Sequence, residues 1–347
     1  MKVFDEIERT SLEGPSSDRS EFAFLNATAI PEAAQMRALI ESAFVSYGGD
    51  KPALRQRLRS LDNTAHLGAV FELLLHELAR RRGLGPQADA PLGAGLPDQR
   101  IELGDNAHAF VECRMLKPGN LKLYDILCDA IDAVQIPSLL YYVRLRKTPG
   151  RSLPVKLLQR DLRQQMMTLD IAALSTKALE NKHHAFAIKD GDDLVLQVIP
   201  YRKPGSKGGV GMMDGAPNDF ATSEELRRGL ERKNRKYADA GAPYIIAICS
   251  AKSYAHDEEV EEALFREGSG EQRGFFIRSP RANVSAVLAC QRWKPSSFAP
   301  SLKLYLNPSA THPLSSNPFG CEAVEYTNGA LVRTAGQSFQ ALMRLPL

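Results

Sequence analysis

The 347-residue chain lacks most of the features that mark specialised classes of protein. Its five cysteines form no Cys-x-x-Cys pair and no zinc-type spacing, and their odd number suits a reducing cytoplasm. No apolar run reaches the length of a membrane span, and the acidic start MKVFDEIERT has no apolar segment of a signal peptide. The sequence therefore predicts a cytoplasmic protein that makes no use of a membrane.

An excess of one charge is also missing, because 44 Lys and Arg residues stand against 41 Asp and Glu residues. The net charge of +3 gives no global basic field, so binding of nucleic acid requires a local basic patch. Neither a P-loop nor a nucleophile elbow occurs in the chain. A small-molecule enzyme of another α/β class therefore has little support.

The most informative stretch is residues 97–116, PDQRIELGDNAHAFVECRML. It predicts a strand over 98–103, a tight GDN turn and a more apolar strand over 109–116. Glu112 lies in the middle of the second strand, where a carboxylate is costly unless it is paired or binds a cation. Adjacent antiparallel strands can bring it together with Asp98, and carboxylate oxygens suit Mg²⁺. The alternative is a surface hairpin with a chance aspartate and a salt-bridged Glu112.

Pro97-Asp98, a spacer and Glu112-Cys113-Arg114 resemble the motif of the PD-(D/E)xK nuclease superfamily, the fold of many restriction and repair endonucleases. The family motif has lysine two residues after the second acid, where this chain has Arg114. The resemblance implies that Asp98, Glu112 and the Cys113 backbone carbonyl hold Mg²⁺ or Mn²⁺, and that a lysine from elsewhere assists. Arg114, Lys233 and Lys236 are the candidates for the assisting cation. Arginine stays protonated and cannot act as a base, so we favour Lys233 for that role and Arg114 for contact with the phosphate.

Residues 64–82 form the strongest predicted helix, with a wide apolar stripe that ends at Gly83. Glu72 lies beside that stripe. Taken alone, Glu72 fits a solvated helix residue. Nucleases of this superfamily often carry an acid on the helix before the motif hairpin, so the resemblance implies that Glu72 is a third metal-site carboxylate.

A second informative helix is predicted over residues 222–240, TSEELRRGLERKNRKYADA, followed by a buried strand at 243–249. One branch of the superfamily carries Q-x-x-x-Y on the corresponding helix, and Lys233 and Tyr237 have the same spacing. The resemblance implies that Lys233 assists the attacking water and that Tyr237 lies beside it. The expected nucleic-acid contacts of this helix are Arg227, Arg228, Arg232 and Lys236. A solvated basic helix with i,i+4 Glu–Lys pairs fits the same residues equally well.

Two further segments carry expectations. A helix over 155–169 is basic on one side through Lys156, Arg160 and Arg163. Residues 202–219, RKPGSKGGVGMMDGAPND, are rich in glycine and predict a mobile loop, as a lid or a DNA-contacting flap.

The segments together predict an α/β fold with a mixed central sheet flanked by helices, a restriction-endonuclease-like core. The α-β-β-β-α-β order rests on the resemblance as much as on periodicity. The expected parts are an N-terminal arm with helices (1–60), a nuclease-like core (61–267) and a packed, β-rich C-terminal extension (268–347). The overall order also resembles a group of bacterial proteins associated with this superfamily, a likeness that brings no known activity with it.

The resemblance implies a metal-dependent endo- or exodeoxyribonuclease that hydrolyses DNA phosphodiester bonds in restriction or phage defence. DNA is the expected partner, and many relatives work as dimers or beside partner subunits. The alternative is a catalytically decayed nuclease-fold module that binds nucleic acid or a partner protein. Arg114 in place of lysine favours that alternative.

Overall fold

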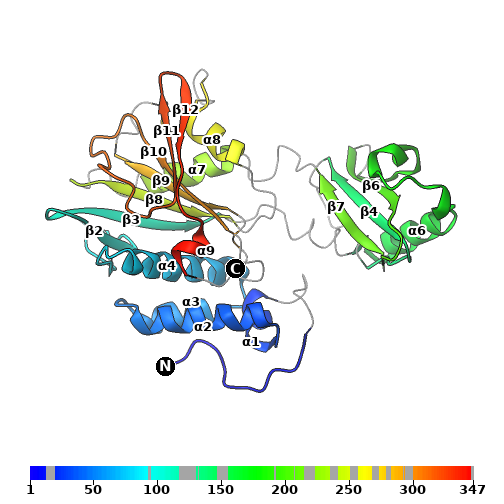
Figure 1. The fold of residues 1–347 in the computed structure, drawn as a ribbon, viewed down its shortest axis with the longest axis horizontal. Helices are drawn as coiled ribbons and strands as arrows, with labels where there is room; N and C mark the ends of the chain where they lie inside the picture. Colours follow the sequence, from blue (N-terminus) through cyan, green and yellow to red (C-terminus); the bar gives the residue numbers. More distant parts are fainter. Residues whose placement is uncertain are drawn as a thin grey trace. The chain divides into compact units, whose positions relative to one another are not determined.

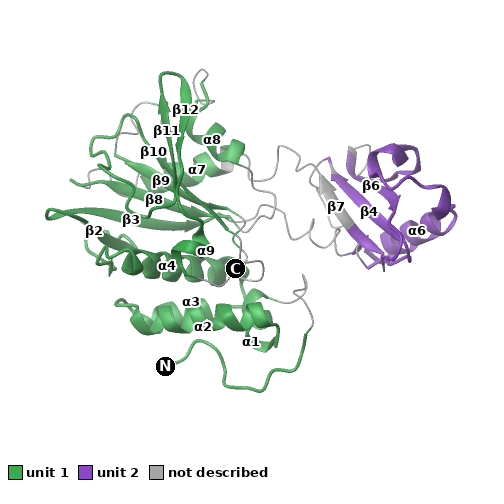
Figure 2. Ribbon diagram, in the orientation of Figure 1, with its two compact units in different colours: residues 1–117, 222–347 green, residues 118–221 purple. Residues whose placement is uncertain are grey.

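The computed structural model describes residues 1–12, 20–92, 95–116, 130–131, 133–146, 155–190, 193–206, 208–214, 223–234, 241–250, 257–267, 273–278, 283–291, 293 and 300–344. The chain divides into two compact units (Figure 2). Unit 1 comprises Met1–Lys117 and Thr222–Leu347, and unit 2 comprises Pro118–Ala221. Unit 2 is therefore inserted in sequence between two parts of unit 1. The expected domain boundaries after residues 60 and 267 stay a prediction.

Unit 1 is built on one large sheet. Its strands are β1 (Gln87–Ala88), β2 (Gln99–Gly104), β3 (Ala107–Met115), β8 (Tyr244–Cys249), β9 (Ala286–Gln291), β10 (Ser301–Leu306), β11 (Glu322–Thr327) and β12 (Ala330–Thr334). They lie in the order β1-β2-β3-β8-β9-β10-β11-β12 (Figure 1). Strands β2 and β3 are antiparallel, whereas β3 and β9 both run parallel to β8. The predicted mixed sheet is therefore confirmed.

Helices cover both faces of this sheet. They are α1 (Glu21–Ala27), α2 (Pro31–Ser46), α3 (Lys51–Leu58), α4 (Asn63–Arg81), α7 (Ser223–Asn234), α8 (Asp257–Phe265) and α9 (Phe339–Leu342). Helix α4 and Val111 of β3 share one buried core, and helices α7 and α8 and Phe110 of β3 share another. Neighbouring strand residues point to opposite faces, so β3 contributes to both cores. The predicted flanking of the sheet by helices is confirmed as well.

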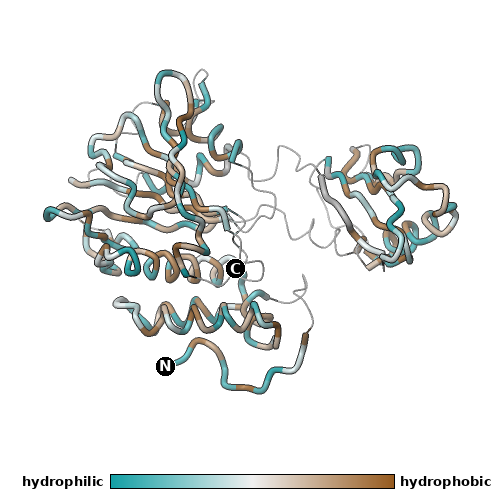
Figure 3. The backbone as a smooth tube through the Cα atoms, viewed as in Figure 1, coloured by the Kyte–Doolittle hydropathy of each residue, from teal (hydrophilic) through white to brown (hydrophobic). Residues whose placement is uncertain are grey.

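Helix α4 positions one of the candidate acids. Asp62 caps its start, accepting hydrogen bonds from the backbone N–H groups of Thr64 (2.7 Å) and Ala65 (3.4 Å). Gly83, with φ +75°, follows its end. Figure 3 shows hydrophobic residues along this helix, and the structure buries nearly all of its turns, including the polar residues Glu72, His76 and Glu77. Among the described residues, no helix combines the length and the apolar character needed to cross a membrane.

Unit 2 contains a smaller sheet in the order β5-β6-β4-β7. Its elements are β4 (Leu139–Leu145), α6 (Val155–Met167), the 3-10 helices η1 (Ile171–Ala173) and η2 (Ala178–His184), β5 (Phe186–Asp190), β6 (Asp193–Arg202) and β7 (Gly209–Asp214). The loop predicted over 202–219 is wrong for the residues of β7, which pair in parallel with β4. A Cβ at Gly208 would lie 2.4 Å from the backbone nitrogen of Ile136, so close backbone approach requires this glycine.

Candidate functional site

The hairpin of β2 and β3 brings Asp98 and Glu112 to the same level of the sheet. Its turn residues Asp105 and Asn106 both have positive φ, +46° and +63°, as a two-residue hairpin turn requires. Gln99 pairs with Val111, so the residues that flank this pair, Asp98 and Glu112, lie opposite one another. The Asp98 Oδ2 atom accepts a hydrogen bond from the Cys113 backbone N–H at 2.6 Å. The two predicted carboxylates are thus neighbours across the hairpin.

A lysine from a distant helix meets the second of these carboxylates. Helix α7 packs on the sheet through Leu226 and Leu230, both buried. Lys233 follows Leu230 by three residues and therefore shares this inward face. The Lys233 Nζ atom forms an ion pair with Glu112 Oε1. Glu112 is only 1% exposed, so Lys233 supplies its counter-charge inside the protein.

Asp98 is the most strongly perturbed acid of the site. Its pKa is raised to about 7, chiefly by burial and also by the negative charges of Glu112 and Glu72, while the Cys113 N–H and Lys233 act in the opposite direction. Close to neutral pH, Asp98 is therefore divided between its protonated and ionised forms. A divalent cation beside the carboxylates would favour the ionised form, because it would offset both the burial and the repulsion.

Glu72 lies close enough to influence Asp98, but its own oxygens already have partners. Arg57 of α3 forms a bidentate ion pair with Glu72, with Nη1–Oε2 at 2.6 Å and Nη2–Oε1 at 2.9 Å. The Tyr47 hydroxyl donates to Oε1 at 3.3 Å. Burial and the charge of Glu72 raise the pKa of Tyr47, so this hydroxyl stays a donor. A role as third metal ligand would require Glu72 to share these contacts.

The side chain at the motif's lysine position turns toward helix α7. Arg114 lies two residues beyond Glu112, on the same face of β3. A Cβ added at Gly229 would lie 3.2 Å from Arg114 Nε, so the absent side chain makes room for the guanidinium. Burial lowers the pKa of Arg114, and the charge of Arg232 lowers it further. Neither Arg114 nor Arg232 has an acidic partner within the described part of the chain. The two guanidinium groups could therefore bind an anion.

The remaining predicted residues are placed only in part. Arg227 is half-buried, whereas Arg228 and Arg232 are exposed on α7. Lys236 and Tyr237 lie outside the described residues. Within the described ranges, no group of three or more His, Cys, Asp or Glu side chains is arranged to hold a metal ion. The hairpin brings two carboxylates together, Asp98 and Glu112, and the role of these groups and of the Cys113 carbonyl as metal ligands stays a prediction.

Two residues of this site escaped prediction from the sequence. Tyr47 and Arg57 precede Glu72 by 25 and 15 residues and lie outside its helix, and they meet it only through tertiary packing. The segment around Arg57 is basic, but no sequence spacing relates Arg57 to Glu72.

Comparisons with protein-family models, with curated proteins and with solved structures find no match to this chain. The resemblance of its motif to the PD-(D/E)xK superfamily stays a prediction. The interpretation of the site therefore depends on its own geometry and chemistry.

Proposed function

We propose that this protein is a metal-dependent nuclease with a restriction-endonuclease-like core, which hydrolyses phosphodiester bonds of DNA. The observation that carries the proposal is the convergence of Asp98, Glu112 and Lys233. These three side chains come from the residue before β2, from β3 and from α7. Two acids with oxygen ligands beside one ammonium group are the side chains that metal-assisted phosphodiester hydrolysis requires.

The order of elements supports this fold. Helix α4, strands β1 to β3, helix α7 and strand β8 follow the α-β-β-β-α-β sequence expected for the core. Strand β3 carries the second acid and pairs in parallel with β8, while the preceding hairpin is antiparallel. The insertion of unit 2 between β3 and α7 leaves this arrangement of the sheet intact.

Asp98, Glu112 and the backbone carbonyl of Cys113 are the groups that would hold Mg²⁺ or Mn²⁺. The raised pKa of Asp98 fits this role, because two buried carboxylates that repel each other gain from a shared cation. Such an ion, when bound, lowers the pKa of a water molecule and stabilises the charge that develops on the phosphate.

Lys233 has a different role in this proposal from Arg114 and Arg232. Lys233 lies at Glu112 and holds a proton beside the expected position of the attacking water. Arginine stays protonated and cannot act as a base. Arg114 and Arg232 are instead suited to binding the phosphate oxygens, for which guanidinium groups offer several donors in one plane.

Cleavage assays test the proposal. The substrates are supercoiled, linear and single-stranded DNA, each with Mg²⁺, with Mn²⁺ or with a chelator. Asp98→Asn and Glu112→Gln should abolish cleavage, and Lys233→Met should reduce it strongly. Glu102→Gln is the matched control, because this exposed acid lies on the same hairpin. Full activity in both Asp98→Asn and Glu112→Gln would overturn the proposal.

The second candidate function is that of a decayed nuclease-fold module that binds nucleic acid or a partner protein. Arg57 favours it, because this residue occupies both oxygens of the third acid, Glu72. Arg114 at the position of the family's lysine favours it too. This module would bind DNA equally well with and without Mg²⁺ and would cleave none of the substrates. The proposed setting of the active enzyme is restriction or phage defence in the cytoplasm, alone, as a homodimer or beside partner subunits.

A further inference from the structure

Helix α6 of unit 2 has one face that is already buried and one that is open to solvent. Leu158, Leu162 and Met166 are buried and recur every four residues, so they form the stripe that packs within unit 2. Lys156, Arg160 and Arg163 are exposed and recur at intervals of four and three residues. These three cations therefore lie on the exposed part of the helix, away from the apolar stripe.

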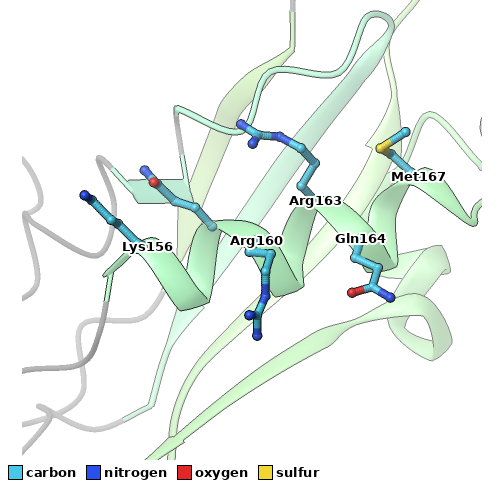
Figure 4. Close-up of a pocket in the computed structure, with 6 residues that line it drawn as sticks. Lys156, Arg160, Arg163, Gln164 and Met167 are labelled. Carbon is cyan, nitrogen blue, oxygen red and sulfur yellow. The ribbon is translucent and has the colours of Figure 1, made fainter.

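Side chains of this face line a shallow pocket of about 460 Å³ (Figure 4). The lining residues are Lys156, Gln159, Arg160, Arg163, Gln164 and Met167. Figure 4 shows Arg163 extending from one side of the helix and Arg160 and Gln164 from the other. The pocket is thus lined by hydrogen-bond donors and positive charges, with Met167 as its apolar member.

The charge balance singles out this unit. Residues 118–221 contain 14 Lys and Arg against 11 Asp and Glu, which accounts for the whole net charge of +3 of the chain. Asp161 is the one acid in the helix sequence, and its carboxylate pairs with its neighbour Arg160, with Nη2–Oδ1 at 2.8 Å. Lys156 and Arg163 form no ion pair with any described residue. Their charges are therefore available to an anionic ligand.

We propose that this α6 face binds the phosphate backbone of duplex DNA. The 13-residue helix is roughly 20 Å long at 1.5 Å per residue, and the DNA major groove, about 12 Å wide, admits a helix. Arginine and lysine contact phosphates, and glutamine amides can also read base edges. Insertion into a membrane surface would need a free apolar stripe, but the stripe of α6 is buried inside unit 2.

The inference goes beyond the proposed active site, which lies in unit 1, and rests on the proposed function only in taking DNA as the ligand. It concerns binding alone. The test is therefore performed with the full chain in a chelator, where no metal-dependent cleavage occurs. The readout is the fluorescence anisotropy of a labelled short DNA duplex, titrated at several salt concentrations.

The decisive variant is the triple substitution Lys156→Ala, Arg160→Ala and Arg163→Ala. Its matched control is Lys182→Ala, Lys189→Ala and Lys203→Ala, three exposed lysines of unit 2 outside α6. Both variants lose the same charge. Loss of three phosphate contacts should weaken binding at least tenfold and reduce the slope of log affinity against log salt by about 2 to 3. The control should keep the wild-type slope.

Equal losses in the two variants would overturn the proposal, because only net charge would then matter. Unchanged binding in the α6 variant would overturn it as well. So would α6-dependent binding to phosphatidylserine vesicles in the absence of DNA binding. The experiment distinguishes failure of the nuclease proposal from failure of this inference. DNA binding that depends on α6, without cleavage, overturns the nuclease proposal alone. Cleavage together with unchanged DNA binding by the α6 variant overturns this inference alone.

Discussion

The ammonium group of Lys233 forms an ion pair with the carboxylate of Glu112, although 121 residues separate the two in sequence. Glu112 is 1% exposed and the Lys233 side chain 20% exposed. A buried carboxylate without a counter-charge costs several kcal/mol, so this contact couples the packing of α7 to the stability of β3. The site and the fold thus depend on the same pair.

Removal of the lysine charge should destabilise the protein. Lys233→Met removes one cation that pairs with the buried Glu112, and we expect the free energy of unfolding to fall by about 2 to 4 kcal/mol in urea denaturation. The double variant Lys233→Met, Glu112→Gln should recover part of this loss. Arg266→Met is the control, because its pair with Glu262 is about half exposed and contributes less than about 1 kcal/mol. If Lys233→Met and Arg266→Met lowered the free energy of unfolding equally, the ion pair of Lys233 with Glu112 would not be the stabilising contact described above.

Asp98 should make the metal-free protein less stable as the pH rises. Its pKa is raised to about 7 in the folded state, chiefly by burial, so folded protein keeps a proton that unfolded protein has released. Stability therefore falls between about pH 4 and about pH 7. Asp98→Asn removes this titration and can still accept the Cys113 hydrogen bond. In a chelator at pH 8 it should be more stable than wild type by on the order of 1 to 3 kcal/mol. If Asp98→Asn kept the pH dependence of the wild-type protein, the titration of Asp98 would not be the cause of the fall in stability.

We predict a separate loss of stability in acid, caused by the protonation of His66. Burial lowers its pKa to about 4, while a hydrogen bond to the Leu58 carbonyl acts in the opposite direction. Unfolded protein binds a proton near pH 6.5 and folded protein only near pH 4, so stability falls as the pH drops through this window, by up to roughly 3 kcal/mol. His66→Asn should flatten this part of a denaturation series measured at several pH values. Exposed His183→Asn should leave it unchanged, and a series unaffected by His66→Asn would exclude His66 as the cause.

Gly229 should separate stability from activity. Alanine in a helix interior usually gains about 0.5 to 1 kcal/mol over glycine. Here the added methyl group would press on the flexible Arg114 side chain, so Gly229→Ala should keep or raise the melting temperature. DNA cleavage should nevertheless fall by roughly tenfold, because Arg114 is displaced from the phosphate. Gly68→Ala is the matched control, since its methyl group would make only an ordinary contact with Met115. Equal cleavage by Gly229→Ala and Gly68→Ala would show that Arg114 does not contact the phosphate.

Local patterns predicted the parts of the fold that depend on neighbouring residues. Helix α4 has its cap, its apolar stripe and its terminal glycine within one continuous stretch. The β2–β3 hairpin has its turn between two patterned strands, and that pairing alone places Asp98 beside Glu112. Lys233 was singled out by its spacing from Tyr237, and the structure places Lys233 at Glu112. Tyr237 itself lies outside the described residues.

Features that depend on tertiary contacts could not be predicted in this way. Arg57 meets Glu72 from a different helix, and no spacing relates the two. Strand β7 is rich in glycine, which favours a loop by composition, yet its backbone pairs with β4. The Pro- and Gly-containing stretches KPGN (117–120) and GAPND (215–219) lie at the borders of unit 2, but such stretches also mark ordinary loops, so they do not show that the chain leaves unit 1 and returns to it.

Metal binding tests the central claim most directly. Chelator-treated protein is titrated with Mn²⁺ and with Mg²⁺ by calorimetry near pH 7, in two buffers of different ionisation enthalpy. We predict one site, absent in Asp98→Ala and Glu112→Ala and retained in Glu102→Gln. Binding should release protons to the buffer, because Asp98 with its pKa of about 7 must ionise. Absence of binding in folded wild-type protein, or unchanged binding in both alanine variants, would contradict the account.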